Sequence, residues 1–179
     1  MFSRKNIQMI VTVALLIMAA ACSLFKQDVN VPQTFELRLD RPAGAAQQFA
    51  VLKDVDTNTE ELKKYKGDVE SFDINSITYR IEDFKGHSDA VISGNLEFAV
   101  SGSSEFTVLD TISDLHLRKM QESGQPNTVV LHDQAVKQKL AMLLQRGSVV
   151  TFRLNATTTD SPIAASLIVA IDTKMTVEL

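Results

Sequence analysis

The chain is poor in the residues that most often build reactive or ligand-binding sites. It has one cysteine, no tryptophan, two tyrosines and three histidines in 179 residues. A single cysteine excludes an internal disulfide, so the burial of apolar side chains has to stabilise the fold. The scarcity of tryptophan and tyrosine argues against a carbohydrate-binding module, because these residues supply the amphipathic rings that such modules present to sugars.

Acidic residues exceed basic ones. The chain has 18 Lys and Arg against 22 Asp and Glu, and removing Arg4 and Lys5 with an N-terminal signal leaves 16 against 22, a formal charge of −6. A net negative domain repels phosphate backbones and anionic lipid head groups. We therefore expect no nucleic acid partner, and we expect membrane association to come from a lipid and not from a basic patch.

The lone cysteine, Cys22, follows a segment with the organisation of a secretory signal. Arg4 and Lys5 form a short basic region, residues 7–21 carry no charge, and Ala19-Ala20-Ala21 directly precede the cysteine. This arrangement resembles the lipobox of bacterial lipoproteins, in which the cysteine becomes the lipidated first residue of the mature chain. Ala19 stands where the usual lipobox has leucine.

The resemblance implies a bacterial lipoprotein held at the cell envelope by fatty acyl chains on Cys22. Ser23 follows the cysteine in place of the aspartate that favours the inner membrane, which implies the outer membrane and does not assign a face of it. Two other interpretations stay open. Ordinary cleavage after Ala21 would release a soluble protein, and an uncleaved anchor would need about 20 apolar residues, more than this segment has.

We expect the chain to divide into three parts. Residues 1–21 form the signal peptide, residues 22–32 form the lipidated N-terminus and a polar tether that ends at Pro32, and residues 33–179 form one domain. This last part is long enough to bury a core of its own.

Alternation of apolar and polar residues dominates the domain and predicts strands with one buried face. The clearest cases are Phe35, Leu37 and Leu39, and the last segment, in which Ile163, Ala165, Leu167, Val169, Ile171, Met175, Val177 and Leu179 all occupy odd positions. Further strands are predicted at residues 48–53, 72–81, 92–100, 106–117 and 150–156. Many short strands separated by turn signals predict a mainly β fold, an antiparallel β-sandwich (Ig-like or similar) of about seven to nine strands.

Three details of these strands can be predicted. The strand at 72–81 changes phase at Asn75-Ser76, which indicates a β-bulge. A turn at 83–89 follows it, so we expect this strand to pair with the one at 92–100 as a hairpin. Ser113-Asp114 is a candidate interruption of the strand at 106–117.

Two helices interrupt the strands. Thr57-x-x-Glu60 has the capping-box pattern and Gly67 supplies a stop, which predicts a short, highly charged helix. Asp133 and Gly147 delimit a second, amphipathic helix, which we expect to pack on an edge or an open end of the sandwich. Its apolar stripe consists of Val136, Leu140, Leu143 and Leu144.

The stretch from Lys64-Tyr65-Lys66 to Ile77-Thr78-Tyr79-Arg80-Ile81 loosely resembles uncharacterised β-sandwich lipoproteins of Gram-negative envelopes. The resemblance covers about a fifth of the chain. It implies the fold and the cellular address and no activity.

Ser88 is the candidate for catalysis. Gly86-His87-Ser88-Asp89-Ala90 resembles the nucleophile elbow G-x-S-x-G, with Ala90 in place of the final glycine. In an elbow, a helix follows the serine, whereas a strand is predicted here, so an ordinary turn is the expected structure.

Metal binding has weaker support. Asp54, Asp56 and Asn58 resemble the start of a calcium loop, but Thr59 and Tyr65 occupy the places of its glycine and its bidentate glutamate. The three histidines, His87, His116 and His132, lack the spacing of metal ligands. We therefore expect no cofactor.

These observations favour a non-catalytic binding or scaffolding module over an enzyme. The alternatives are an envelope hydrolase that uses Ser88 and a carrier that holds an apolar ligand inside the sandwich. Loops carry function more often than sheet faces, so an envelope protein partner is expected at the loops 41–47, 85–89 or 119–128. The last loop holds the candidate partner residues Gln121, Glu122, Ser123, Gly124, Gln125 and Asn127.

Overall fold

A computed structural model describes residues 26–87 and 89–178, which form nine strands and three helices. The strands are β1 (Lys26–Asn30), β2 (Gln33–Arg41), β3 (Gln48–Asp56), β4 (Val69–Gly86), β5 (Val91–Val100), β6 (Thr107–His116), β7 (Asn127–Thr128), β8 (Val149–Thr158) and β9 (Ile163–Glu178). The helices are α2 (Glu60–Lys64), α3 (Leu117–Ser123) and α4 (Gln134–Gln145).

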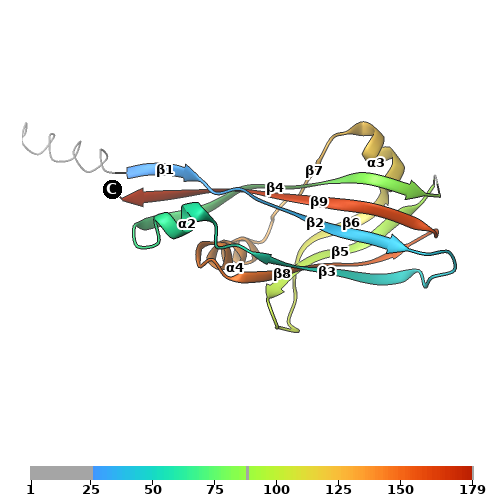
Figure 1. The fold of residues 1–179 in the computed structure, drawn as a ribbon, viewed down its shortest axis with the longest axis horizontal. Helices are drawn as coiled ribbons and strands as arrows, with labels where there is room; N and C mark the ends of the chain where they lie inside the picture. Colours follow the sequence, from blue (N-terminus) through green and yellow to red (C-terminus); the bar gives the residue numbers. More distant parts are fainter. Residues whose placement is uncertain (1–25, 88, 179) are drawn as a thin grey trace, which may run out of the picture.

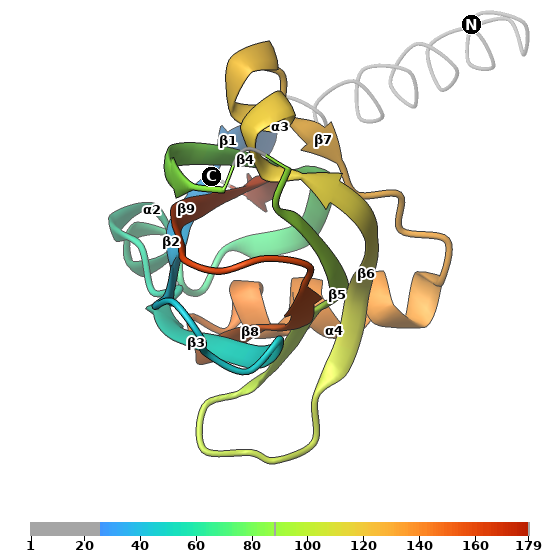
Figure 2. The same cartoon turned by 90° about the vertical axis from the view of Figure 1, so that its right-hand side faces the viewer.

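The strands form two antiparallel sheets that face each other (Figure 1). In the first sheet, β9 lies between β4 and the pair β1 and β2, and β7 adds to the far edge of β4. The second sheet has the order β3-β8-β5-β6. Figure 2, along the strands, shows the two layers with α4 beside the second sheet. The predicted mainly β, antiparallel sandwich is confirmed.

β9 is the central strand of the first sheet. It pairs with β2 along residues 163–171, with β1 along residues 174–178, and with β4 on its other edge. Its odd-numbered residues from Ile163 to Val177 are buried, as the sequence pattern predicts. A strand that is paired on both edges and buried on one face needs this strict period of two.

The predicted hairpin between residues 72–81 and 92–100 is wrong. β4 pairs with β9 and β7, whereas β5 pairs with β6 and β8 in the other sheet. The chain also changes sheet between β2 and β3 and between β8 and β9. Alternation identifies the face that a strand buries, but a strand can bury that face in either sheet of a sandwich. The pattern therefore does not predict which strands pair.

Two irregularities lie where the sequence predicts them. The register between β4 and β9 shifts between Ile74 and Ser76, which confirms the bulge. In β6, Asp114 has a left-handed φ of 50°, and the pairing with β5 shifts between Ile112 and Leu115. β6 therefore continues through Ser113-Asp114 as a bulged strand.

The polar tether predicted for residues 22–32 is wrong from Lys26 onward. Residues 26–30 form β1, and Val31 is fully buried and donates its backbone N–H to the Thr173 carbonyl over 2.9 Å. β1 has little apolar alternation because backbone pairing and polar contacts hold it, among them an ion pair of 3.0 Å between Asp28 and Lys174.

Both predicted helices are present, but α2 differs from the prediction at both ends. It ends at Lys64 with Tyr65 as its C-cap, so Gly67 is not its left-handed stop. Asp133 caps α4 by accepting the Ala135 N–H, and the α4 leucines are buried against the sheets. In α2 the cap is Thr59, which accepts the Leu62 N–H, and not Thr57. Thr57 is instead fully buried, and its hydroxyl donates to the Ser148 carbonyl over 2.7 Å. A buried hydroxyl needs such a partner, and this one comes from a distant segment.

The first sheet extends past the second at one end (Figure 1). There a small hydrophobic cluster, separate from the main core, joins the ends of β9 and β4 to α2. Its buried members are Val31, Leu62, Met175 and Val177. The short helix therefore covers apolar surface that the second sheet does not reach.

Gly94 lies where β5 and β8 approach closely. A Cβ there would lie 2.2 Å from the Asn155 carbonyl oxygen and 2.5 Å from the Ala156 Cα. We expect Gly94→Ala to lower the free energy of unfolding by about 1–3 kcal/mol through overpacking. The control is Gly67→Ala, whose Cβ meets nothing within 4 Å. Urea unfolding that ranks the two variants as equal would contradict this packing.

Met175 tests the small cluster at the overhanging end. Its side chain is fully buried, whereas Glu178 three residues on is exposed. We expect Met175→Ala to lower the free energy of unfolding by about 2–5 kcal/mol and Glu178→Ala to change it little. If both variants unfold at the wild-type urea concentration, this end of β9 is not an integral part of the domain.

Candidate functional site

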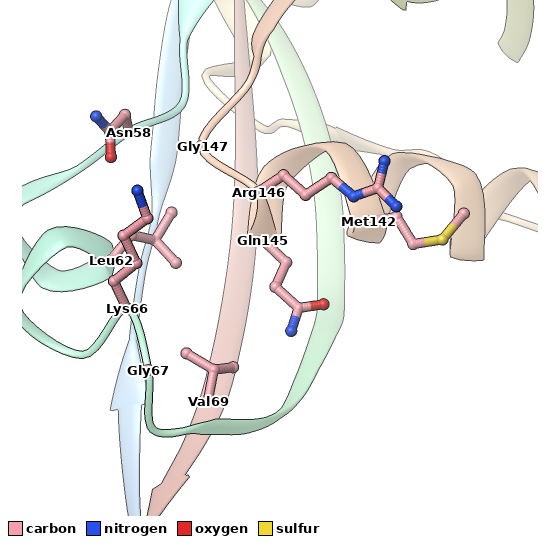
Figure 3. Close-up of a pocket in the computed structure, with 9 residues that line it drawn as sticks. All are labelled: Asn58, Leu62, Lys66, Gly67, Val69, Met142, Gln145, Arg146 and Gly147. Carbon is pink, nitrogen blue, oxygen red and sulfur yellow. The ribbon is translucent and has the colours of Figure 1, made fainter.

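A cleft of about 530 Å³ opens between α2 and the C-terminal end of α4 (Figure 3). This volume lies within the range of about 300–1,000 Å³ that is usual for small-molecule sites. The cleft lies at the end of the sandwich where the first sheet overhangs. Its lining residues are Asn58, Leu62, Lys66, Gly67, Val69, Met142, Gln145, Arg146 and Gly147.

Two segments distant in sequence are clamped together beside the cleft. Gly147, just past the C-terminus of α4, has a left-handed φ of 63° and packs so closely on Asn58 that a Cβ would lie 3.0 Å from the Asn58 Oδ1. The adjacent Ser148 carbonyl accepts hydrogen bonds from both the hydroxyl and the backbone N–H of Thr57. These contacts fix the end of α4 relative to the start of α2.

The lining of the cleft combines cations with apolar side chains. Lys66 lies on the α2 side of the cleft, whereas the Arg146 side chain extends along α4 toward Met142 and away from Lys66 (Figure 3). Leu62 is buried, and Met142 is 49% exposed. Among the residues that the structure describes, no aspartate or glutamate lines the cleft. It therefore presents positive charge and apolar surface together.

The sequence analysis did not find this site. Its residues come from positions 58–69 and 142–147, and only the fold brings these segments together. Lys66 and Arg146 follow helices, where cations are common because they interact favourably with the negative end of the helix dipole. Met142 is the one signal that could have been noticed, as an apolar residue outside the leucine stripe of α4.

The candidate calcium residues do not converge. Asp54 accepts hydrogen bonds from the hydroxyls of Thr151 and Ser101, and Asp56 accepts the backbone N–H of Asn58 over 2.9 Å. Within residues 26–87 and 89–178, no group of three His, Cys, Asp or Glu side chains is placed to hold a metal ion.

The turn that carries the elbow-like motif leads into a strand. Ser88 itself lies outside the described residues, but the Ala90 N–H donates to the His87 carbonyl over 3.2 Å, which closes a four-residue turn before β5. The His87 Nδ1 lies 3.9 Å from an Asp160 carboxylate oxygen on the neighbouring turn. His116 and His132 are exposed elsewhere.

The predicted partner loop at 119–128 is wrong as a long irregular segment. Gln121, Glu122 and Ser123 form the last turn of α3, Gly124 caps it with a φ of 62°, and Asn127 belongs to β7. The helix is held by its buried residues, Leu117 and Met120. Only Gly124, Gln125 and Pro126 remain as a loop. The strand predicted at residues 106–117 includes Leu117, so that prediction does not recognise the helical spacing of Leu117 and Met120.

Two acidic side chains, the buried Tyr79 and the partly buried Asp110, have shifted pKa values. Burial raises the pKa of Tyr79, and a hydrogen bond from the Asn127 amide partly opposes this rise. Burial also raises the pKa of Asp110, against the effect of a hydrogen bond from the Thr111 backbone. Each pKa shift favours the neutral form of its group.

The raised pKa of Asp110 predicts a pH-dependent stability. An acid with a higher pKa in the folded than in the unfolded state lowers the stability as the pH rises through that range. We expect Asp110→Asn to raise the free energy of unfolding at neutral pH, by less than about 1 kcal/mol because the group is partly solvated, and to leave it unchanged near pH 3. The control is Asp73→Asn on an exposed position of β4. Equal effects of the two substitutions at neutral pH would contradict this.

Cys22 lies outside the described residues. Within the part of the chain that the structure describes, no helix is long and apolar enough to cross a membrane.

Comparison with protein-family models finds no match, and no curated protein matches. Two solved structures show a weak likeness. One, from Desmodium yellow mottle tymovirus, is 12% identical with a TM-score of 0.34 and covers 86% of this chain and 84% of its own. The other, from turnip yellow mosaic virus, is 9% identical with a TM-score of 0.30 and covers 86% and 95%. Likeness at these TM-scores carries no argument about function.

Proposed function

We propose that the protein is an envelope lipoprotein, anchored by acyl chains on Cys22, whose β-sandwich is a non-catalytic binding module. The cleft between α2 and α4 is its binding site in this proposal. Ser23 after the cysteine favours the outer membrane as the location.

The observation that carries the proposal is the position of β1 relative to Cys22. β1 begins at Lys26, four residues after the cysteine, and it is paired with the last residues of β9. Four extended residues reach about 14 Å. An anchor on Cys22 would therefore hold the cleft-bearing end of the sandwich close to the bilayer (Figure 1).

The turn at 86–90 favours a binding module over a hydrolase. A nucleophile elbow needs a helix after the serine, and here β5 follows.

The core favours the cleft over the sandwich interior as a ligand site. Phe35 and Phe152 stack between the sheets with their ring centroids 4.2 Å apart, and Phe98 is fully buried beside them. A carrier of an apolar ligand would therefore use the cleft.

The anchor can be tested by replacing the cysteine. We expect wild-type protein to partition into detergent and its mature N-terminus to carry diacylglyceryl and acyl masses on Cys22, whereas Cys22→Ala stays in the aqueous phase. Mass spectrometry of the N-terminus and detergent partitioning measure this. An exported Cys22→Ala protein that stays as membrane-bound as wild type would overturn the proposal.

A further inference from the structure

We propose that the free edge of β3 binds an extended segment of a partner protein, which adds to the four-stranded second sheet as a further strand. The segment would place an apolar side chain opposite Leu52 and cationic side chains opposite Asp54 and Asp56. This surface is separate from the cleft and gives the module a second contact.

β3 is an edge strand whose outer side is unpaired. It stands first in the strand order β3-β8-β5-β6, and only β8 pairs with it (Figure 2). In the described part of the chain, the backbone of residues 48–56 makes no hydrogen bond outside its ladder with β8. A row of free N–H and C=O groups is a template for another strand, and it supplies main-chain affinity to an extended peptide.

Regular pairing distinguishes β3 from β6, the opposite edge of the same sheet. The nine residues of β3 pair with β8 without a shift of register. The pairing of β6 has two shifts, Asp114 has a left-handed φ of 50°, and the Asp110 carboxylate accepts the Thr111 N–H over 2.9 Å. Bulges turn an edge away from a new strand, and a capped N–H cannot pair with one. The edge of β6 is therefore protected, whereas that of β3 is open.

Exposed apolar surface also marks β3. Leu52, the middle residue of the strand, is 56% exposed, and Val51 and Val55 are half-buried. In β2, the edge strand that precedes β3 in the chain, every exposed residue is polar or charged. An exposed leucine is stabilised when a partner covers it, which favours β3 over β2 as the place of contact.

The charges of β3 determine the chemistry of the partner. Asp54 and Asp56 alternate along the strand in phase with Leu52, toward its C-terminal end. Their carboxylates accept hydroxyl and backbone N–H groups, and neither forms an ion pair within the described residues. Opposite charges attract across paired strands, so lysine or arginine suits the facing positions. A hollow of about 430 Å³ beside Leu52 and Asp54 leaves room for a long side chain.

A second copy of the chain does not fit the edge as well as another protein does. Two identical edges pair antiparallel about a two-fold axis, so the two domains run in opposite directions. β1 begins four residues after Cys22, at one end of the domain (Figure 1). The two proposed anchors would therefore lie at opposite ends of such a dimer, and one bilayer could not hold both. The free backbone and the carboxylates of β3 are independent of that anchor.

The test measures the binding of short fluorescein-labelled peptides to the full chain in phosphatidylcholine nanodiscs, by fluorescence anisotropy. The basic probe, Lys-Val-Lys-Thr-Ile-Val-Thr, places its lysines opposite Asp56 and Asp54 and its isoleucine opposite Leu52 in antiparallel pairing. We expect it to bind about tenfold more tightly than Glu-Val-Glu-Thr-Ile-Val-Thr. N-methylation of alternate peptide nitrogens should abolish binding in the phase that faces β3 and change it little in the other phase, because successive N–H groups point to opposite sides of a strand.

A matched pair of protein variants locates the contact. Leu52→Lys should weaken binding of the basic probe about tenfold, because it removes apolar contact and adds a like charge. The control is Val108→Lys, the same change at an apolar residue of β6 that is 43% exposed, and it should leave the affinity unchanged. If Leu52→Lys unfolds the protein, the methylated peptides decide, since they leave the chain unaltered.

Any of four results would overturn the proposal: no binding of the basic probe, equal affinity for the acidic probe, equal effects of the two N-methylation phases, or equal effects of Leu52→Lys and Val108→Lys. A dimer in analytical ultracentrifugation that Leu52→Lys dissociates would assign the edge to a second copy and also overturn it. The intact mass of each sample reports lipidation of Cys22. An unlipidated chain that binds the basic probe contradicts the anchor and supports the contact at β3.

Discussion

β9 is hydrogen-bonded along both of its edges, and the rest of the structure depends on this double ladder. On one edge it holds β2 and then β1, and on the other it holds the full length of β4. The strands that flank it enter the second sheet through turns, so the position of β9 sets how the two sheets face each other. Because its odd residues are buried without interruption, a shift of one residue would expose the core of the whole domain.

The same ladder creates the site. β9 and β4 run past the end of the second sheet, and among the described residues α2 packs on the apolar face that this leaves open, beside the C-terminal end of α4. The cleft lies between these two elements. The contacts of Thr57 with Ser148 and of Gly147 with Asn58 hold its walls in place, which makes the cleft a preformed feature.

Much of the fold could be predicted because one-sided burial imposes a period of two, as in β2 and β9, and because Asp133 and Gly147 have unambiguous roles at the ends of α4. The sequence could not predict which strands pair with each other, since β4 and β5 bury the same kind of face in different sheets. β1 could not be predicted because backbone pairing holds it in the sheet, without a pattern of alternating apolar side chains. The site could not be predicted because nothing in the sequence distinguishes Lys66 and Arg146, and only the fold brings their segments together.

Native-state hydrogen exchange of the amides of β9 tests the central role of this strand most directly. If the double ladder holds the domain, the amides from residue 164 to residue 177 exchange only through global unfolding, and those beside β1 are protected as well as those beside β2. Exchange of residues 172–177 by local opening, at a free energy well below that of global unfolding, would contradict the account, because the overhanging sheet and the cleft that it carries would then not be part of the cooperative core.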